Sequence, residues 1–164
     1  MYDQEELKRL FIYGPHTGNF YRKTSPCNSA NVGDIAGTKT RDDGYTYIRF
    51  RGRPVAAQKL AWLFMYGEWP SEKVDHKDRN RANNAISNLR LATSSQNQQN
   101  RKLCSRSTTG VKGVGLHKAS GKYQVTLTID GKKKHFGLFT DIETAELVAR
   151  GAREKYHGEY HNHG

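Results

Sequence analysis

The sequence predicts an α+β fold in three parts: a β-rich N-terminal segment, a central strand–loop–strand–helix core, and a C-terminal three-stranded antiparallel sheet packed on one helix. Three observations predict this order. Short alternating stretches with glycine turns dominate the first third, apolar residues at helical spacing follow, and two alternating runs precede a second helical stripe. We place the parts at 1–52, 53–103 and 109–164, with a linker at 104–108.

The N-terminal segment is expected to consist of short strands and turns. Its clearest signal is DDGYTYIRFRGR, which alternates between two faces after the hairpin turn signal Asp43-Gly44. The central core then opens with AAQKLAWLFMYG, whose apolar residues recur at helical spacing. Gly67 is a typical C-terminal stop for such a helix. We therefore expect a hairpin that leads into a helix.

The C-terminal segment has the most regular pattern. GVKGVGLH predicts a short strand, and KYQVTLTID alternates between an apolar and a polar face. The turn signal Asp130-Gly131 leads from there into KKKHFGLF. Thr140 and Glu143 form a predicted capping box, after which an apolar stripe continues at helical spacing. These signals predict three antiparallel strands covered by one helix.

Charge favours a polyanionic partner. The net charge is +11, and the sequence pI is near 9.7. The excess of Lys and Arg over Asp and Glu is largest in residues 53–108, where ten basic residues face four acidic ones. A field of that sign attracts polyanions and speeds their association.

The stretch VDHKDRNRANNAISNLRLATSSQNQQNR, residues 74–101, concentrates polar side chains that suit phosphodiester hydrolysis. That reaction needs a nucleophilic water, stabilisation of charge on the phosphate and help for the leaving oxygen. A Mg²⁺ ion held by one or two protein oxygens can serve the last two needs. A neutral imidazole can serve the first. The adjacent Asp75 and His76 are therefore a candidate metal ligand and a candidate general base.

Two asparagines complete the predicted site. SNLRLAT has strand-like apolar spacing, and either Thr93 or Ser94 can N-cap a helix over SSQNQQNR. Asn97 falls near the first turn of this helix, where its side-chain oxygen can be a second metal ligand. Asn88 stands between the loop and the second strand, and its carbonyl and amide can tie the loop to the strand.

These residues resemble the H-N-H endonucleases of the ββα-metal fold, especially the homing-type enzymes of phages and mobile introns. The resemblance rests on the spacing DH-x11-N-x8-N, on EWP before it and on NLR-x2-T-x3-N-x2-N within it. It implies a metal-dependent DNA endonuclease with one Mg²⁺ or Mn²⁺ per active site. It also implies His76 as general base, Asn88 as loop-bracing residue, and Asp75 and Asn97 as metal ligands. Four further residues match recurrent family positions: Asn83, Asn84, Arg90 and Asn100.

One position departs from that family pattern. Relatives commonly have A-H-R-L-A-W at the start of the helix, whereas this chain has AQKLAW, with Gln58 in place of the histidine. The departure leaves the base and the metal ligands in place and affects an auxiliary contact. It favours one alternative, a non-catalytic DNA-binding regulator with a degenerate nuclease core. An RNA-binding protein is a weaker alternative, because Tyr123 falls on the apolar face instead of an exposed stacking face.

Residues 109–160 resemble the Apetala2-type DNA-binding domain, in which a β-sheet lies in the major groove and contacts base edges. Plant relatives carry arginine and tryptophan on the sheet where this chain has lysine, glutamine and threonine, so sequence specificity is not transferred. The predicted DNA contacts are Arg79, Arg81, Arg90 and Arg101 from the core, and Lys122, Gln124, Thr126, Thr128, Lys133 and His135 from the sheet.

These inferences lead to expectations about partners and location. Double-stranded DNA is the expected partner, without a membrane and without an obligate protein partner. No apolar run reaches 18 residues, and the N-terminus, with acids before bases, does not read as a secretory signal. Two distant cysteines, Cys27 and Cys104, suggest a reducing compartment. We expect a cytoplasmic protein, in a bacterial host cell if a phage or mobile element encodes it.

Overall fold

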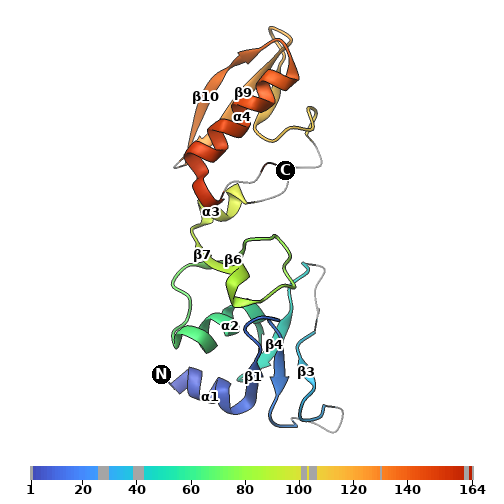
Figure 1. Cartoon of the computed structure of the whole chain (residues 1–164), viewed down its shortest axis with the longest axis vertical. Coiled ribbons are helices and arrows are strands. Elements are labelled where there is room, and N and C mark those ends of the chain that lie inside the picture. Colours follow the sequence, from blue (N-terminus) through green and yellow to red (C-terminus); the bar gives the residue numbers. More distant parts are fainter. Residues whose placement is uncertain are drawn as a thin grey trace. The chain divides into compact units, whose positions relative to one another are not determined.

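The structure of the protein is a computed structural model. It describes residues 2–25, 30–38, 43–100, 103, 107–129, 131–160 and 163. The chain divides into two compact units, Met1–Ala92 and Thr93–Gly164, coloured blue to yellow-green and yellow to red in Figure 1. This division falls inside the central core expected at 53–103, whereas most of the expected linker lies outside the described residues. Within the described part of the chain, no helix combines the length and apolar character needed to cross a membrane.

Unit 1 consists of short strands around a central helix. Its elements are α1 (Tyr2–Leu10), β1 (Phe11–Tyr13), β2 (Phe20–Arg22), β3 (Ile35–Ala36), β4 (Tyr47–Phe50), β5 (Arg53–Ala56), α2 (Ala57–Tyr66), β6 (Lys73–His76), η1 (Ile86–Asn88) and β7 (Leu89–Ala92). The strands pair antiparallel as β1-β2-β3, β4-β5 and β6-β7. The β-rich prediction is confirmed, but helix α1 precedes the strands. Its acidic first turn and basic last turn match the helix dipole, a signal from which α1 could have been predicted.

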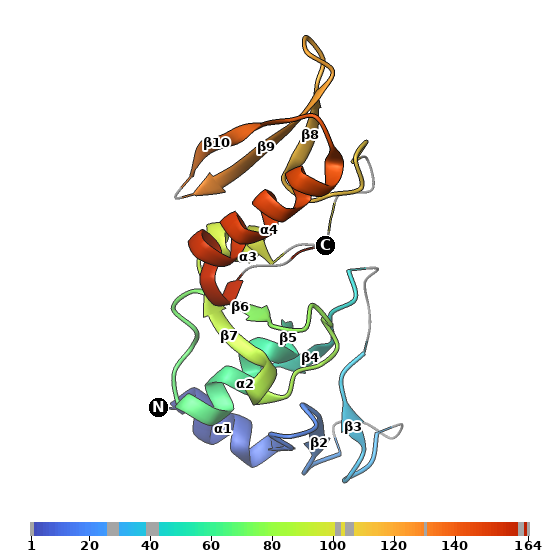
Figure 2. The ribbon, with the colours of Figure 1, turned by 45° about the horizontal axis from the view of Figure 1, so that its top comes forward.

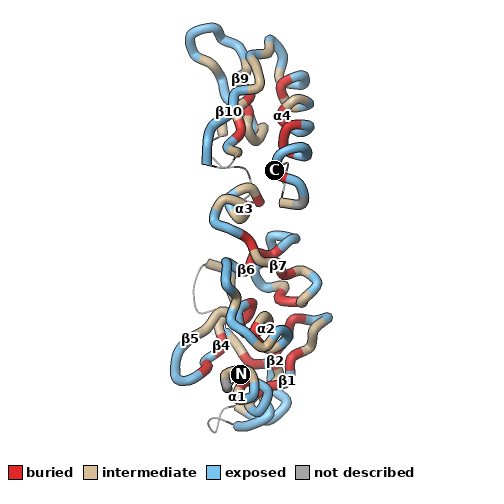
Figure 3. The backbone as a smooth tube through the Cα atoms, turned by 90° about the vertical axis from the view of Figure 1, so that its left-hand side faces the viewer, coloured by how far each residue is buried: buried red, intermediate tan, exposed pale blue. Residues whose placement is uncertain are grey.

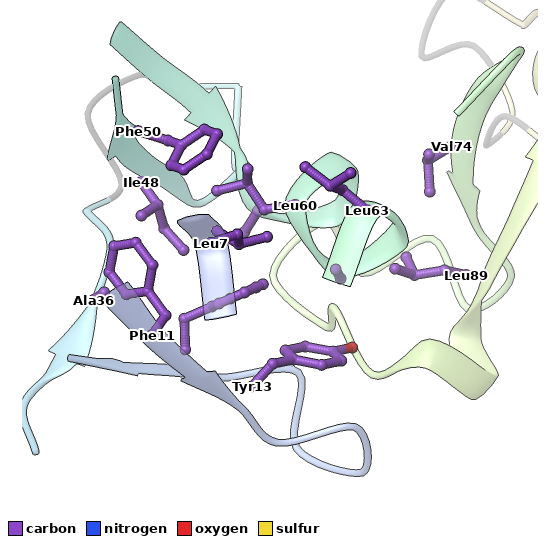
Figure 4. Close-up of a cluster of buried hydrophobic side chains, with 13 residues drawn as sticks. Leu7, Phe11, Tyr13, Ala36, Ile48, Phe50, Leu60, Leu63, Val74 and Leu89 are labelled. Carbon is purple, nitrogen blue, oxygen red and sulfur yellow. The ribbon is translucent and has the colours of Figure 1, made fainter. Parts of the chain in front are cut away.

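Helix α2 forms the centre of the unit 1 core. Its buried residues Leu60 and Leu63 belong to one apolar cluster with Leu7 of α1. The same cluster includes Val74 of β6 and Leu89 of β7, which lie on the far side of α2 in Figure 4. Burial of apolar surface therefore holds the N-terminal segment and the β6–β7 pair together in one unit.

The end of α2 agrees with its sequence signal. Gly67 has a φ of 81°, and its N–H donates to the carbonyl of Leu63 at 3.0 Å. A residue with a Cβ is strained in this left-handed conformation, which explains the glycine. At its other end α2 follows β5 directly, and the N–H of Ala57 donates to the carbonyl of Thr46 at 2.8 Å.

Unit 2 contains the predicted three-stranded sheet and its covering helix. Its elements are α3 (Ser94–Gln99), β8 (Val114–His117), β9 (Lys122–Ile129), β10 (Lys132–Phe139), α4 (Ile142–His157) and η2 (Gly158–Tyr160). The antiparallel strands have the order β10-β9-β8, and α4 crosses one face of the sheet (Figure 2). Val125 of β9 packs there against Ala145 and Ala149, which are buried on α4. Figure 3 shows buried and exposed stretches alternating along α4, as expected for a helix with one face against a sheet. The predicted α+β class is thus confirmed.

The two helix starts in unit 2 separate one correct prediction from one wrong one. Thr93 caps α3 in a capping box with Gln96, so Thr93 and not Ser94 is the N-cap. The box expected between Thr140 and Glu143 does not form. Helix α4 is capped instead by Asp141, whose side chain accepts from the N–H of Thr144 at 2.7 Å. The carboxylate of Asp141 is the stronger acceptor and also favours the positive end of the helix dipole.

Candidate active site

The candidate site begins at the C-terminal end of β6. Asp75 and His76 are the last two residues of this strand, and they pair across the ladder with Arg90 and Leu89 of β7. Both side chains are buried, with 7% and 3% of the residue exposed. Ionisable side chains are rarely buried unless they have partners. The contacts of each therefore indicate its role.

Asp75 forms an ion pair across the strands with Arg90. Its Oδ2 accepts from Nε and from Nη2 of Arg90, each at 3.1 Å. The two side chains are only 8% and 10% exposed. The β6–β7 register explains the contact, because residues directly opposite in an antiparallel pair project from the same face. The structure thus gives Arg90 a carboxylate partner, and its expected contact with a DNA phosphate stays a prediction.

His76 is held by a neighbouring asparagine and an aromatic ring. Its Nε2 lies 3.1 Å from Oδ1 of Asn84, and its ring centre lies 5.9 Å from that of Tyr45. Burial lowers the pKa of His76 below its ordinary value, against the opposing effect of the Asn84 hydrogen bond and of two nearby carboxylates. The imidazole is therefore neutral at pH 7, the form that a general base requires.

Asn88 braces the loop that follows β6. Its Nδ2 donates to Oδ1 of Asp78 at 2.9 Å and to the carbonyl of Asn83 at 2.8 Å. Its Oδ1 accepts from the N–H of Asp78 at 3.0 Å, and its own carbonyl accepts from the N–H of Lys77 at 2.9 Å. Both ends of the amide thus tie the loop to the start of β7. Any further part of Asn88 in catalysis stays a prediction.

Asp78 is the centre of the loop, and sequence reasoning missed it. Its carboxylate accepts from the N–H of Asn80 at 2.8 Å and from Nδ2 of Asn83 at 2.7 Å, in addition to Asn88. Burial raises the pKa of Asp78, but these hydrogen bonds outweigh it and the net pKa is lowered. The signal that was available is the Asp-x-Asn spacing, typical of an Asx turn.

Two of the predicted DNA-contacting arginines lie exposed on this loop. Arg79 has a φ of 65°, which is uncommon for a residue with a side chain. Arg81 donates from Nη1 to the carbonyl of Asp43 at 2.6 Å, and its guanidinium lies 4.9 Å from the ring centre of Tyr45. The ring of Tyr45 therefore contacts both Arg81 and His76. Arg101 lies outside the described residues.

Gln58, the departure from the family pattern, lies inside unit 1. It is buried on α2, and among the described residues its Oε1 has no hydrogen-bond partner. A buried carbonyl without a partner reduces stability. The side chain is thus placed in the interior of the unit and not on its surface.

The predicted metal ligands differ in kind from a histidine or cysteine cluster. Among the described residues, no group of three or more His, Cys, Asp and Glu side chains could hold a metal ion. The predicted set is one carboxylate, Asp75, and one amide oxygen, Asn97. Such a donor set fits Mg²⁺, which takes few protein oxygens and keeps several waters. Asn97 lies half-buried on α3 of unit 2, and its part in a shared metal site stays a prediction.

The outer face of the unit 2 sheet carries the other predicted DNA contacts. Side chains of β9 alternate, and Val125 and Leu127 are buried on the helix side. Lys133 pairs with Thr128, and His135 pairs with Thr126. The six predicted residues therefore share the face away from α4: Lys122, Gln124, Thr126, Thr128, Lys133 and His135.

A bulge adds an apolar residue to this outer face, and sequence reasoning missed it. The register shifts between His135 and Gly137, so that Leu138 pairs with Gln124. Leu138 is 40% exposed. Gly137 has a φ of 132°, and a glycine inside a strand pattern is the available signal for a bulge.

Comparison of the sequence with known proteins identifies a family for this chain. Residues 55–99 match the sequence model of the HNH endonuclease family. Protein 3.8 of Escherichia phage T7 is 34% identical over 87 residues, which make up 53% of this chain and 71% of the phage protein. The chain belongs to the HNH endonuclease family. The matched HNH segment runs from β5 to the end of α3, and it includes Asp75, His76, Asn88 and Asn97.

A solved structure is also similar to this chain. It is that of the HNH homing endonuclease I-HmuI, described as showing DNA binding and cleavage. The two share 20% identity and a TM-score of 0.46, with 93% of this chain and 86% of the other covered. The HNH segment, residues 55–99, is defined by the sequence match.

Proposed function

We propose that the protein is a metal-dependent DNA endonuclease of homing type, encoded by a phage or mobile element, in which His76 is the general base. One observation carries the proposal: at a strand end inside the HNH segment, a buried imidazole whose pKa is lowered by burial directly follows a buried carboxylate. In this reaction His76 takes a proton from the water that attacks the scissile phosphate. The water oxygen forms a bond to phosphorus, and the bond from phosphorus to the 3′ oxygen breaks.

Asp75 and Asn97 are the residues that would hold the divalent cation, Mg²⁺ or Mn²⁺. When bound, the cation stabilises charge on the phosphate and on the departing oxygen. The chain's own contribution is to orient Asp75, which the ion pair with Arg90 does at 3.1 Å. Asn88 and Asp78 keep the following loop in one conformation, so that the strand end does not fray.

Two surfaces are suited to contact the DNA. Exposed Arg79 and Arg81 lie on the loop next to His76 and can bind phosphates. In unit 2 the outer sheet face offers side chains that can reach base edges and phosphates, in line with the Apetala2-type prediction. The net charge of +11 supports a polyanionic substrate.

One observation favours a second candidate, a DNA-binding regulator without nuclease activity. Gln58 replaces a frequent family histidine, and its buried carbonyl lacks a hydrogen-bond partner among the described residues. A core that has lost selection for catalysis would accumulate such defects. The retained contacts of Asp75, His76 and Asn88 favour the nuclease instead.

Incubation of the full chain with supercoiled plasmid distinguishes these two functions. We expect nicked or linear product with Mg²⁺ or Mn²⁺ and none with a chelator. His76→Ala should reduce the cleavage rate by roughly 10²- to 10⁴-fold while DNA affinity is retained. His117→Ala, which removes a histidine on β8 of unit 2, outside the HNH segment, is the matched control. Unchanged plasmid with every metal, together with tight DNA binding, would support the regulator.

A further inference from the structure

The orientation of the Asn84 side chain determines which ring nitrogen of His76 carries the proton. It is buried, with 2% of the residue exposed. Its Nδ2 donates to the carbonyl of Ala82 at 3.3 Å, and its Oδ1 lies 3.1 Å from Nε2 of His76. An amide oxygen can only accept a hydrogen bond. Nε2 of His76 must therefore carry the proton, and Nδ1 is the basic nitrogen of the neutral ring.

Asn84 is itself held by a residue far away in the sequence. The hydroxyl of Tyr13 donates to the backbone carbonyl of Asn84 at 2.6 Å. Figure 4 shows this hydroxyl directed away from the apolar cluster, towards the loop that precedes β7. The Tyr13 ring packs against the rings of Phe20 and Phe64, with distances between ring centres of 4.7 Å and 5.6 Å. Burial raises the pKa of Tyr13 above its ordinary value, so the hydroxyl keeps its proton and remains a donor.

The turn between β1 and β2 lies against the backbone at Asn84. Gly18 has a φ of 74°, and a Cβ there would lie 2.4 Å from the amide nitrogen of Ala85 and from the carbonyl carbon of Asn84. The N–H of Ile86 donates to the carbonyl of Pro15 at 3.0 Å. The backbone of the turn thus lies directly against the backbone at Asn84, with no room for a side chain between them.

We propose that Asn84 is the positioning residue of His76, and that the N-terminal hairpin, residues 11–22, holds Asn84 in place. The hairpin is then a working part of the nuclease site and not an accessory to it. This inference rests on the proposed function, because the tautomer of His76 matters to the reaction only if His76 is the base. During the reaction Nδ1 receives the proton of the water. The N–H at Nε2 of His76 keeps its hydrogen bond to Oδ1 of Asn84, and this amide oxygen stabilises the imidazolium.

A pair of variants with matched shape tests the acceptor. Asn84→Asp keeps an oxygen where Oδ1 lies, whereas Asn84→Leu keeps the volume and removes the acceptor. For Asn84→Leu we expect kcat to fall by roughly 10- to 100-fold with KM for DNA unchanged, and Asn84→Asp should recover most of that loss. A purely structural role predicts no such recovery.

A nuclear magnetic resonance measurement tests the geometry without any cleavage. In the metal-free full chain, long-range proton–nitrogen spectra should show the His76 proton on Nε2, as a slowly exchanging imidazole N–H. That signal should persist in Asn84→Asp and disappear in Asn84→Leu. A proton on Nδ1 in the wild-type protein would overturn the proposal. Failure of the wild type to cleave any DNA would instead count against the nuclease function, and the N–H signal would still decide the geometry.

The hairpin is tested with variants that leave Asn84 and His76 unchanged. Tyr13→Phe removes only the hydroxyl that holds Asn84, and kcat should fall by less than the loss in Asn84→Leu, with faster exchange of the His76 N–H. Tyr21→Phe is the matched control, because Tyr21 lies on the same hairpin opposite Ile12. Equal activity of both tyrosine variants, with unchanged exchange of the His76 proton, would show that the hairpin does not hold Asn84.

Discussion

Arg90 lies directly across the β6–β7 ladder from Asp75, and its Nε and Nη2 each donate to Oδ2 of that carboxylate at 3.1 Å. Both side chains are almost fully buried. Whichever partner is removed, the other charge remains in a poorly hydrated place. The pair therefore links the stability of unit 1 to the proposed metal ligand, and its loss should affect both.

Replacing Arg90 tests this link. Arg90→Ala should lower the free energy of unfolding of unit 1 by about 3–5 kcal/mol, because it removes the ion-pair partner of a buried carboxylate. Asp75→Asn combined with Arg90→Gln should cost less than the sum of the two single changes. Urea unfolding followed by tryptophan fluorescence measures this, since both tryptophans, Trp62 and Trp69, lie in unit 1. Additive effects would show that the two charges do not interact.

The pKa of Asp78 predicts how stability depends on pH. Its folded pKa lies below the unfolded value of about 3.9, because hydrogen bonds from Asn83, Asn80 and Asn88 outweigh burial. The unfolded state therefore binds more protons in this range, and the stability from Asp78 is full above the unfolded pKa. It is lost as the pH falls through the folded pKa.

Asp78→Asn isolates this contribution. The variant should be less stable than the wild type at pH 7, because an amide cannot accept all three hydrogen bonds. The difference should shrink as the pH falls below about 4. Fluorescence-monitored urea midpoints between pH 7 and pH 3 provide the test. A difference that stays constant with pH would mean that the Asp78 charge contributes nothing.

The lysines on the outer sheet face should make DNA affinity depend on salt concentration. Lys122→Ala and Lys133→Ala should each weaken binding on all sequences and reduce the slope of log affinity against log salt by about 1. Lys155→Ala is the control. Lys155 is exposed on α4, which covers the opposite face of the sheet, so the variant removes the same charge away from the outer face. Titrations by fluorescence anisotropy at several salt concentrations measure the slopes. Equal slopes for the three variants would remove the sheet face from the DNA contact.

Because each unit has its own hydrophobic cluster, we expect a substitution in one cluster to destabilise only that unit. Leu60→Ala should destabilise unit 1 by about 2–5 kcal/mol, because Leu60 is fully buried at the centre of its cluster. Val125→Ala in the other cluster should leave the tryptophan transition unchanged. Amide exchange of α4 should respond to Val125→Ala alone. A shift of the tryptophan midpoint by Val125→Ala would show that the units unfold together.

Sequence patterns by themselves determined the local elements. The alternation in KYQVTLTID, the stop at Gly67 and the cap at Thr93 were predictable because each depends on residues within one or two turns or along one strand. The candidate residues of the site were recognised in the same way, through a spacing along a short stretch. In these cases the interacting groups are close in the chain, so that their geometry follows from backbone periodicity.

Only the tertiary structure decided how those residues are held. The contact of Arg90 with Asp75 follows only from the β6–β7 register, whereas its predicted contact with DNA stays a prediction. Tyr13 carried no signal at all, because its partner Asn84 is 71 residues away. Such contacts depend on the path of the loops and on how α2 packs against both strands and hairpin. That path results from many small free-energy contributions of buried side chains spread over the whole unit. No short stretch of sequence includes all of these side chains.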